Sequence, residues 1–257
     1  MFSDTQIREV FHFCFLGRLL RLSDPSIYVL KGGVNLRFFF NSPRYSEDMD
    51  IDVLAGSVAT LKKNGYKILN DAAFRRSLRL FDIDDIEIND PGKAKHTDTT
   101  QRFRFALITP AGQRLPTKVE FSRRQRDGND HFVTDFIDAE VAREYRKLAF
   151  RCQHYAGHAA VVQKVKALAG RAVTQARDVF DLAILFRGGH APSEPFKELM
   201  SERKVSQAIE CLLRLSWDDY DGQVVEFLDA NSRDEYGDKQ SWESLQTFVL
   251  ETLEANA

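Results

Sequence analysis

Residues 46–53 read Ser-Glu-Asp-Met-Asp-Ile-Asp-Val, and this alternation of charged and apolar side chains decides how the chain is interpreted. As a β-strand, the stretch turns its apolar side chains to one face and three carboxylates, Asp48, Asp50 and Asp52, to the other. Like charges ~7 Å apart on one face repel each other, and burial of the strand increases that cost. Magnesium would remove the repulsion, because it binds oxygen ligands and commonly takes one or two carboxylates together with substrate phosphates. An exposed acidic edge strand is the alternative.

A glycine turn precedes this strand. Residues 27–30 are β-rich and run into Lys31-Gly32-Gly33, after which a helix is predicted for residues 34–40. Most glycine pairs are ordinary turns. Between a strand and a helix, however, the pair lets backbone N–H groups and the helix dipole face an anion such as a triphosphate. Phosphates and their metal would then meet in one cleft.

The composition limits the classes of function. The 257 residues are 43% hydrophobic, which is enough for a large core in one or two domains. A net charge of -2 excludes generic affinity for nucleic acid, so RNA binding would need a local basic patch. Three cysteines without CxxC spacing, and no targeting or membrane-spanning segment, predict a cytoplasmic protein. The candidates for a basic patch are Arg102, Arg104, Arg123, Arg124 and Arg126.

The hydrophobic periodicity predicts an α+β fold. Helical spacing covers residues 5–22 and 58–81, and almost everything beyond residue 139. Three extended segments, residues 85–89, 102–108 and 115–122, lie between the last two helical regions. We therefore expect a mixed sheet carrying helices in residues 1–139, followed by a helical domain in residues 140–257.

Two motifs together, KGGVNLR at residues 31–37 and RYSEDMDID at residues 44–52, resemble the AbiEii-type nucleotidyltransferase toxin family of the DNA polymerase beta superfamily. The resemblance implies a nucleotidyltransferase-like fold, two Mg²⁺ ions and an NTP substrate. It implies a third metal-binding carboxylate beside Asp48 and Asp50, and the match is Glu120, where the family more often has aspartate. A solvated Glu120, or an ion pair with Lys118 or a nearby arginine, is the alternative. Asp52 is expected to cap the carboxylate face without binding metal.

Residues 163–182 contain QKVKAL and ARDVFDL, which are similar to the second block of this family. The resemblance implies that Lys164 and Asp178 join Asp48 and Asp50 as catalytic residues, and that the helical domain completes the cleft. Without the resemblance, the same residues would be interpreted as a charged helix face and an N-cap. Gln163 stands where the family usually has an acidic residue. The predicted nucleotide-binding residues are Lys31, Gly32, Gly33, Arg37, Ser46 and Arg177, and Arg44 is a further phosphate candidate.

These features predict a magnesium-dependent enzyme that moves an NMP from an NTP to an acceptor. The resemblance implies an RNA acceptor, with the 3′ end of tRNA foremost, and a toxin with a cognate antitoxin. Transfer to a protein hydroxyl is one alternative, and a nucleotide-binding protein without turnover is another. A structural module with an accidental acidic strand is the third. His154 and His158 have a spacing compatible with zinc, but the glutamate of a zinc-protease motif is missing.

Overall fold

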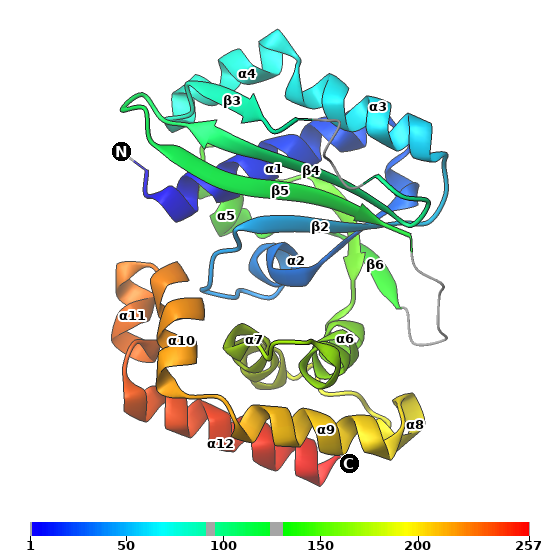
Figure 1. The fold of residues 1–257 in the computed structure, drawn as a ribbon, viewed down its shortest axis with the longest axis vertical. Coiled ribbons are helices and arrows are strands. Elements are labelled where there is room, and N and C mark those ends of the chain that lie inside the picture. The colour runs from blue at the N-terminus through cyan, green and yellow to red at the C-terminus, as the bar shows by residue number, and fades with distance from the viewer. Residues whose placement is uncertain (1, 91–95, 124–130, 257) are drawn as a thin grey trace. The chain divides into compact units, whose positions relative to one another are not determined.

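The structure, a computed structural model, describes residues 2–90, 96–123 and 131–256 (Figure 1). The described chain divides into two compact units, one of residues 2–39, 45–90, 96–123 and 132–154, the other of residues 40–44, 131 and 155–256. The first unit thus extends past the boundary expected at residue 139. Helix α5 (Ala139–Glu144) and most of strand β7 (Arg151–Tyr155) belong to it. None of the helices in the described ranges is long and apolar enough to cross a membrane.

Within the described residues, the strands of the first unit form one seven-stranded mixed sheet in the order β3-β4-β5-β2-β1-β7-β6. Pairing is parallel for β2 with β5 and for β1 with β7, and antiparallel for β1 with β2, β3 with β4 and β4 with β5. The expected mixed sheet with helices is therefore confirmed. The remaining strands are β1 (Tyr28–Lys31), β2 (Asp48–Val53), β3 (Asp85–Ile88), β4 (Thr100–Ile108), β5 (Arg114–Ser122) and β6 (Phe132–Phe136).

Strand β7 corrects the expectation that the chain is helical after residue 139. It pairs with β1 at Leu30 and His154, and its residues Cys152 and His154 are buried. The segment is short and its strand state depends on this tertiary pairing, which local periodicity does not report. His154 therefore lies on a strand and His158 on a helix, so the two do not share a helix face.

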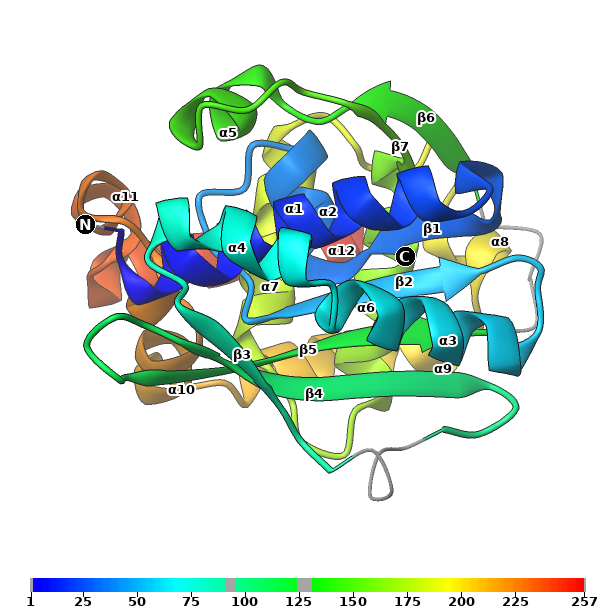
Figure 2. The ribbon, with the colours of Figure 1, turned by 90° about the horizontal axis from the view of Figure 1, so that it is seen from above.

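Helix α1 (Asp4–Leu22) covers the apolar face of the sheet together with α3 (Val58–Leu69) and α4 (Ala72–Leu78), as Figures 1 and 2 show. Ser3 and Gln6 form a capping box that begins α1. The rings of Phe11 on α1 and Phe105 on β4 lie 4.9 Å apart. Because side chains alternate along β4, Phe105 and its apolar neighbours face α1 while Arg104 faces the opposite side.

The second unit is helical, as expected for the C-terminal half. Helix α7 packs against α6 and α12, and α9 packs against the same two helices (Figure 1). The buried side chains of α7 include Val179, Phe180 and Leu182, at helical spacing. The helices are α6 (Gly157–Gly170), α7 (Ala176–Arg187), α8 (Phe196–Leu199), α9 (Glu202–Leu213), α10 (Trp217–Gln223), α11 (Ala230–Tyr236) and α12 (Lys239–Ala255).

Candidate active site

The parallel pairing of β2 with β5 brings the predicted carboxylates onto one face of the first unit. In this register Asp48 lies opposite Lys118, and Asp50 lies opposite Glu120. Paired residues on adjacent strands point to the same side, and the strands are about 4.8 Å apart. Asp48, Asp50 and Glu120 are thus neighbours on the face that α1 leaves uncovered, although Glu120 is far from the other two in the sequence.

Cations on the same face accompany these carboxylates. The Nζ atom of Lys118 lies 2.5 Å from Oδ2 of Asp48, and Nε of Arg102 lies 2.5 Å from Oε2 of Glu120. Glu120 therefore forms an ion pair with a nearby arginine. Among the described residues, no group of three His, Cys, Asp or Glu side chains is arranged to hold a metal ion. Lys118 and Arg102 alternate with apolar residues along β5 and β4. This alternation is the sequence signal that could have placed them on the carboxylate face.

Lys31 and Asp52 form a separate ion pair on this face. The ammonium of Lys31 donates a short hydrogen bond to Oδ1 of Asp52, and both side chains are more than nine-tenths buried. Lys31 lies opposite Asp50 in the β1–β2 register, so its side chain reaches along the strand to Asp52. The pair neutralises the third carboxylate of the strand. Asp52 thus contributes a paired, buried carboxylate beside Asp48 and Asp50.

The pKa of the Asp50 carboxyl group is raised above its usual range. Burial raises its pKa, the neighbouring charges of Glu120 and Asp48 raise it further, and Lys118 and Lys31 oppose the increase. Some of the side chain remains open to solvent. Raised pKa values of this kind are common in functional sites, because the charge becomes favourable only when a cation is bound.

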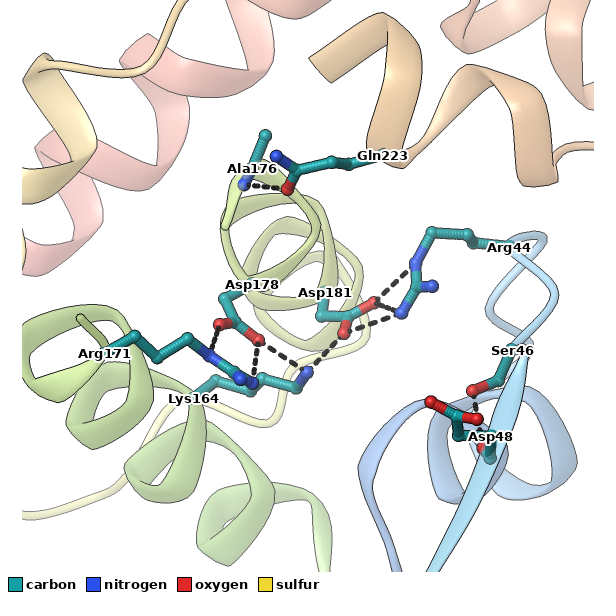
Figure 3. Close-up of polar contacts among 9 residues, drawn as sticks. All are labelled: Arg44, Ser46, Asp48, Lys164, Arg171, Ala176, Asp178, Asp181 and Gln223. Atoms are coloured by element: carbon teal, nitrogen blue, oxygen red, sulfur yellow. Dashed lines mark hydrogen bonds and ion pairs between the residues drawn. The ribbon is translucent and has the colours of Figure 1, made fainter. Parts of the chain in front are cut away.

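The glycine turn approaches Asp50 closely. Helix α2 (Gly32–Phe39) begins at Gly32, two residues before the predicted start, and Gly32 has a φ of +68°. A Cβ atom on Gly32 would lie 3.3 Å from Oδ2 of Asp50. Glycine therefore allows both the left-handed backbone and the close approach. Ser46 supports the strand, since its hydroxyl donates a hydrogen bond of 2.9 Å to the Asp48 carbonyl (Figure 3).

Arg37, predicted to bind nucleotide, anchors α2 to α1. Its Nε atom lies 2.6 Å from Oε2 of Glu9, which is 3% exposed, and the Tyr145 hydroxyl donates a 2.6 Å hydrogen bond to Oε1 of the same carboxylate. The guanidinium also lies over the ring of Tyr45, 4.4 Å from its centroid. This buried network holds the helix that follows the glycine turn.

The second unit contains its own charged cluster (Figure 3). Nζ of Lys164 lies 2.9 Å from Oδ1 of Asp178 and 2.5 Å from Oδ2 of Asp181. Arg171 adds a 2.7 Å contact between its Nε and Oδ2 of Asp178, and Nη2 of Arg44 contacts both oxygens of Asp181 at 3.0 Å. Both aspartates are fully buried. Lys164 thus donates hydrogen bonds to both aspartates of α7.

The titration of this cluster follows from its contacts. Burial alone would lower the pKa of Lys164, but Asp178 and Asp181 outweigh it and the pKa is raised. Burial would raise the pKa of Asp178, but Lys164 and Arg171 outweigh it and the pKa is lowered. Lys164 and Asp178 are therefore both charged at neutral pH.

Other predicted residues lie outside these two groups. Arg177 is half-buried in the first turn of α7. Arg104 is exposed on the carboxylate side of β4, and Arg123 is half-buried. Arg124 and Arg126 of the expected basic patch lie outside the described residues. The sequence did not reveal that Gln223 accepts a hydrogen bond from the Ala176 amide at 2.8 Å and so caps the start of α7 (Figure 3).

A mixed sheet with a glycine turn against spaced carboxylates defines the protein as a nucleotidyltransferase. A family model described as "Nucleotidyl transferase AbiEii toxin, Type IV TA system" matches residues 14–246. The chain belongs to this family. Membership implies an NTP substrate and an antitoxin partner. Among curated proteins, no sequence matches the chain.

Solved structures share the fold. The nucleotidyltransferase toxin MenT4 from Mycobacterium tuberculosis is 15% identical, with a TM-score of 0.60 over 98% of this chain and 84% of that one. A putative nucleotidyltransferase from H. pylori is 18% identical, with a TM-score of 0.55 over 99% of this chain and 98% of that one. JHP933 from Helicobacter pylori is 18% identical, with a TM-score of 0.54 over 99% and 95% of the two chains.

Proposed function

We propose that this protein is a magnesium-dependent toxin that transfers an NMP from an NTP to RNA in the cytoplasm, with the 3′ end of tRNA as the acceptor. The observation that carries the proposal is the β2–β5 register, which sets Asp50 beside Glu120 with Asp48 on the same face. These side chains offer only oxygen donors, the ligand type that Mg²⁺ prefers. The donor set therefore fits magnesium. Bound there, magnesium would polarise the phosphate oxygens and lower the pKa of the acceptor hydroxyl.

The chain's own residues would bind and orient the substrates. The backbone at Gly32 and Gly33, at the start of α2, would accept the triphosphate. Lys118 and Arg102 would exchange their carboxylates for phosphate oxygens when the metal is bound. A cavity of about 310 Å³ lies beside Asp48, with Arg104 and Lys118 in its lining. Its cations suit the backbone of an RNA acceptor.

The test is pyrophosphate release with each of the four labelled NTPs, magnesium and total RNA, using the natural protein and Asp48→Asn. Asp98→Asn, which removes an exposed carboxylate from the same unit, is the control. Metal-dependent label in RNA that is lost only in Asp48→Asn supports the proposal. Label in protein would indicate a hydroxyl side chain as acceptor. Nucleotide binding without pyrophosphate release would indicate a binding protein.

The role expected for the helical domain is tested separately. Lys164→Met should lower the transfer rate if the ammonium neutralises phosphate charge. Arg214→Met is a matched control, because Arg214 is an exposed cation of the same unit whose partner is Glu210. Equal rates in the two variants would remove Lys164 from the catalytic residues.

A further inference from the structure

The first unit contains a second cavity of about 540 Å³. It is lined by α1, by α4 and by the segment after α5, residues 146–150. This volume lies within the range of small-molecule binding sites. Helix α1 covers the apolar face of the sheet, as the Phe11–Phe105 contact shows, whereas the carboxylates are on the other face. The sheet therefore separates this cavity from the candidate active site.

Four cations line the cavity: Arg18, Arg21, Arg146 and Lys147. No acidic residue is among the lining residues. Arg18 pairs with Asp71 at 2.7 Å, but no carboxylate of the described residues pairs with Arg21 or Arg146. The excess positive charge favours an anionic ligand, and guanidinium groups match the geometry of phosphate oxygens.

The remaining lining is largely aromatic and aliphatic. Phe150 is half-buried, and Leu148 in the same segment is 91% exposed. Gly17 in the middle of α1 leaves room for the Phe150 ring, since a Cβ atom there would lie 3.2 Å from its Cε1 atom. An accessible phenylalanine beside arginines is a surface on which a nucleobase can stack.

The backbone of Arg146 is an independent indication of function. Its φ is +52°, and the Lys147 amide bonds to the Ala142 carbonyl while the Arg146 amide bonds to the Arg143 carbonyl. This is the Schellman ending of a helix, in which glycine normally occupies the left-handed position. An arginine at this position is strained relative to glycine, and residues with such strain cluster at ligand-binding sites.

We propose that this cavity binds a nucleoside phosphate, with its phosphates on Arg21 and Arg146 and its base against Phe150 and Leu148. The lining elements are helices and a helix-terminal segment, so an extended peptide would find no strand edge for main-chain pairing. The ligand is either a free nucleotide or one nucleotide of an RNA strand. The site requires neither magnesium nor Asp48.

Isothermal titration calorimetry with ADP in EDTA tests the proposal, and Asp48→Asn serves as the parent to weaken binding at the active site. Adding Arg146→Gly should weaken ADP binding about tenfold, because a charge-assisted phosphate contact is lost. The same variant should raise the melting temperature by about 2 °C, because glycine relieves the left-handed strain. Arg21→Ala should weaken binding similarly. Arg143→Gln removes one charge from α5, and Arg143 does not line the cavity, so this variant should change neither property.

A six-residue oligoadenylate is the second probe. If it binds the parent and loses affinity in Arg146→Gly while ADP does not bind, the ligand is a nucleotide of an RNA strand, and the proposal holds. If neither probe binds the parent, or if both variants bind as the parent does, the proposal is overturned. An acidic, tryptophan-containing peptide is the alternative ligand: if it binds the parent when ADP and the oligoadenylate do not, and its binding is lost in Arg146→Gly, the cavity belongs to a protein partner. That result would also overturn the proposal.

Discussion

Lowering the pH from 7 to 5 should destabilise the first unit through His12, a buried residue of α1. Its Nε2 atom lies 3.0 Å from Oγ1 of Thr117, and the Thr117 hydroxyl donates its proton to the Glu47 carbonyl at 2.5 Å. Nε2 must therefore carry the hydrogen in this contact. Burial lowers the pKa of His12 to about 4, against the opposing effect of the Asp48 charge.

The sign and size of the effect follow from this pKa. The unfolded chain takes up the proton near pH 6.5, before the folded chain does. The stability that neutral His12 contributes is therefore complete above pH 6.5 and is lost as the pH falls toward 4. At pH 5 the loss in the free energy of unfolding is about 2 kcal/mol.

The assay compares the natural protein with His12→Gln, which keeps a donor for Thr117 but does not titrate in this range. Urea unfolding is followed by far-ultraviolet circular dichroism in EDTA, because both tryptophans, Trp217 and Trp242, lie in the second unit. Between pH 7 and 5 the natural protein should lose about 2 kcal/mol more than the variant. The reasoning is refuted if both lose the same amount, or if nuclear magnetic resonance shows the His12 ring titrating near pH 6.5.

Three further perturbations have definite expected outcomes. Asp178→Asn should lower the stability of the second unit by about 3 kcal/mol, because the buried ammonium of Lys164 loses a counter-charge, and an unchanged urea midpoint by tryptophan fluorescence would contradict this. Lys118→Met removes the ammonium 2.5 Å from Asp48, which competes with a metal ion for that carboxylate. The variant should bind Mn²⁺ roughly fivefold more tightly without nucleotide, as electron paramagnetic resonance can measure. Equal affinities of the two proteins would show that Lys118 and the metal ion do not compete. Gly65→Ala would place a Cβ atom 2.4 Å from an aromatic ring of β4 and should cost about 2 kcal/mol in urea unfolding. Gly170→Ala, which meets open space, should cost far less, so similar losses would refute the steric account.

Local patterns were sufficient to predict much of the first unit. The helical spacing of residues 5–22 and the alternation on β2 and β5 became the observed elements, because propensity, capping and burial agree there. Strand β7 was not predicted, since only its pairing with β1 makes it a strand.

The partners of the candidate site residues were harder to predict. The sequence indicated that Glu120 would lie near Asp50, but the contact between Lys118 and Asp48 depends on a register between strands that are distant in the chain. Similarly, Arg44 and Asp181 meet only after the segment of residues 40–44 joins the helices of the second unit. Spacing along the sequence does not contain such long-range pairings.

The parallel pairing of β2 with β5 also bears on when the proposed active site can assemble during synthesis of the chain. Asp50 and Glu120 become neighbours only after β5 has left the ribosome, and the chain between them, whose described part contains β3 and β4, must be synthesised first. Contacts between distant residues form late, because closure of the intervening chain precedes them. A nascent chain that ends before residue 114 therefore contains the glycine turn and two of the carboxylates but not the third. Translation itself would delay assembly of the carboxylate group until most of the first unit has been synthesised.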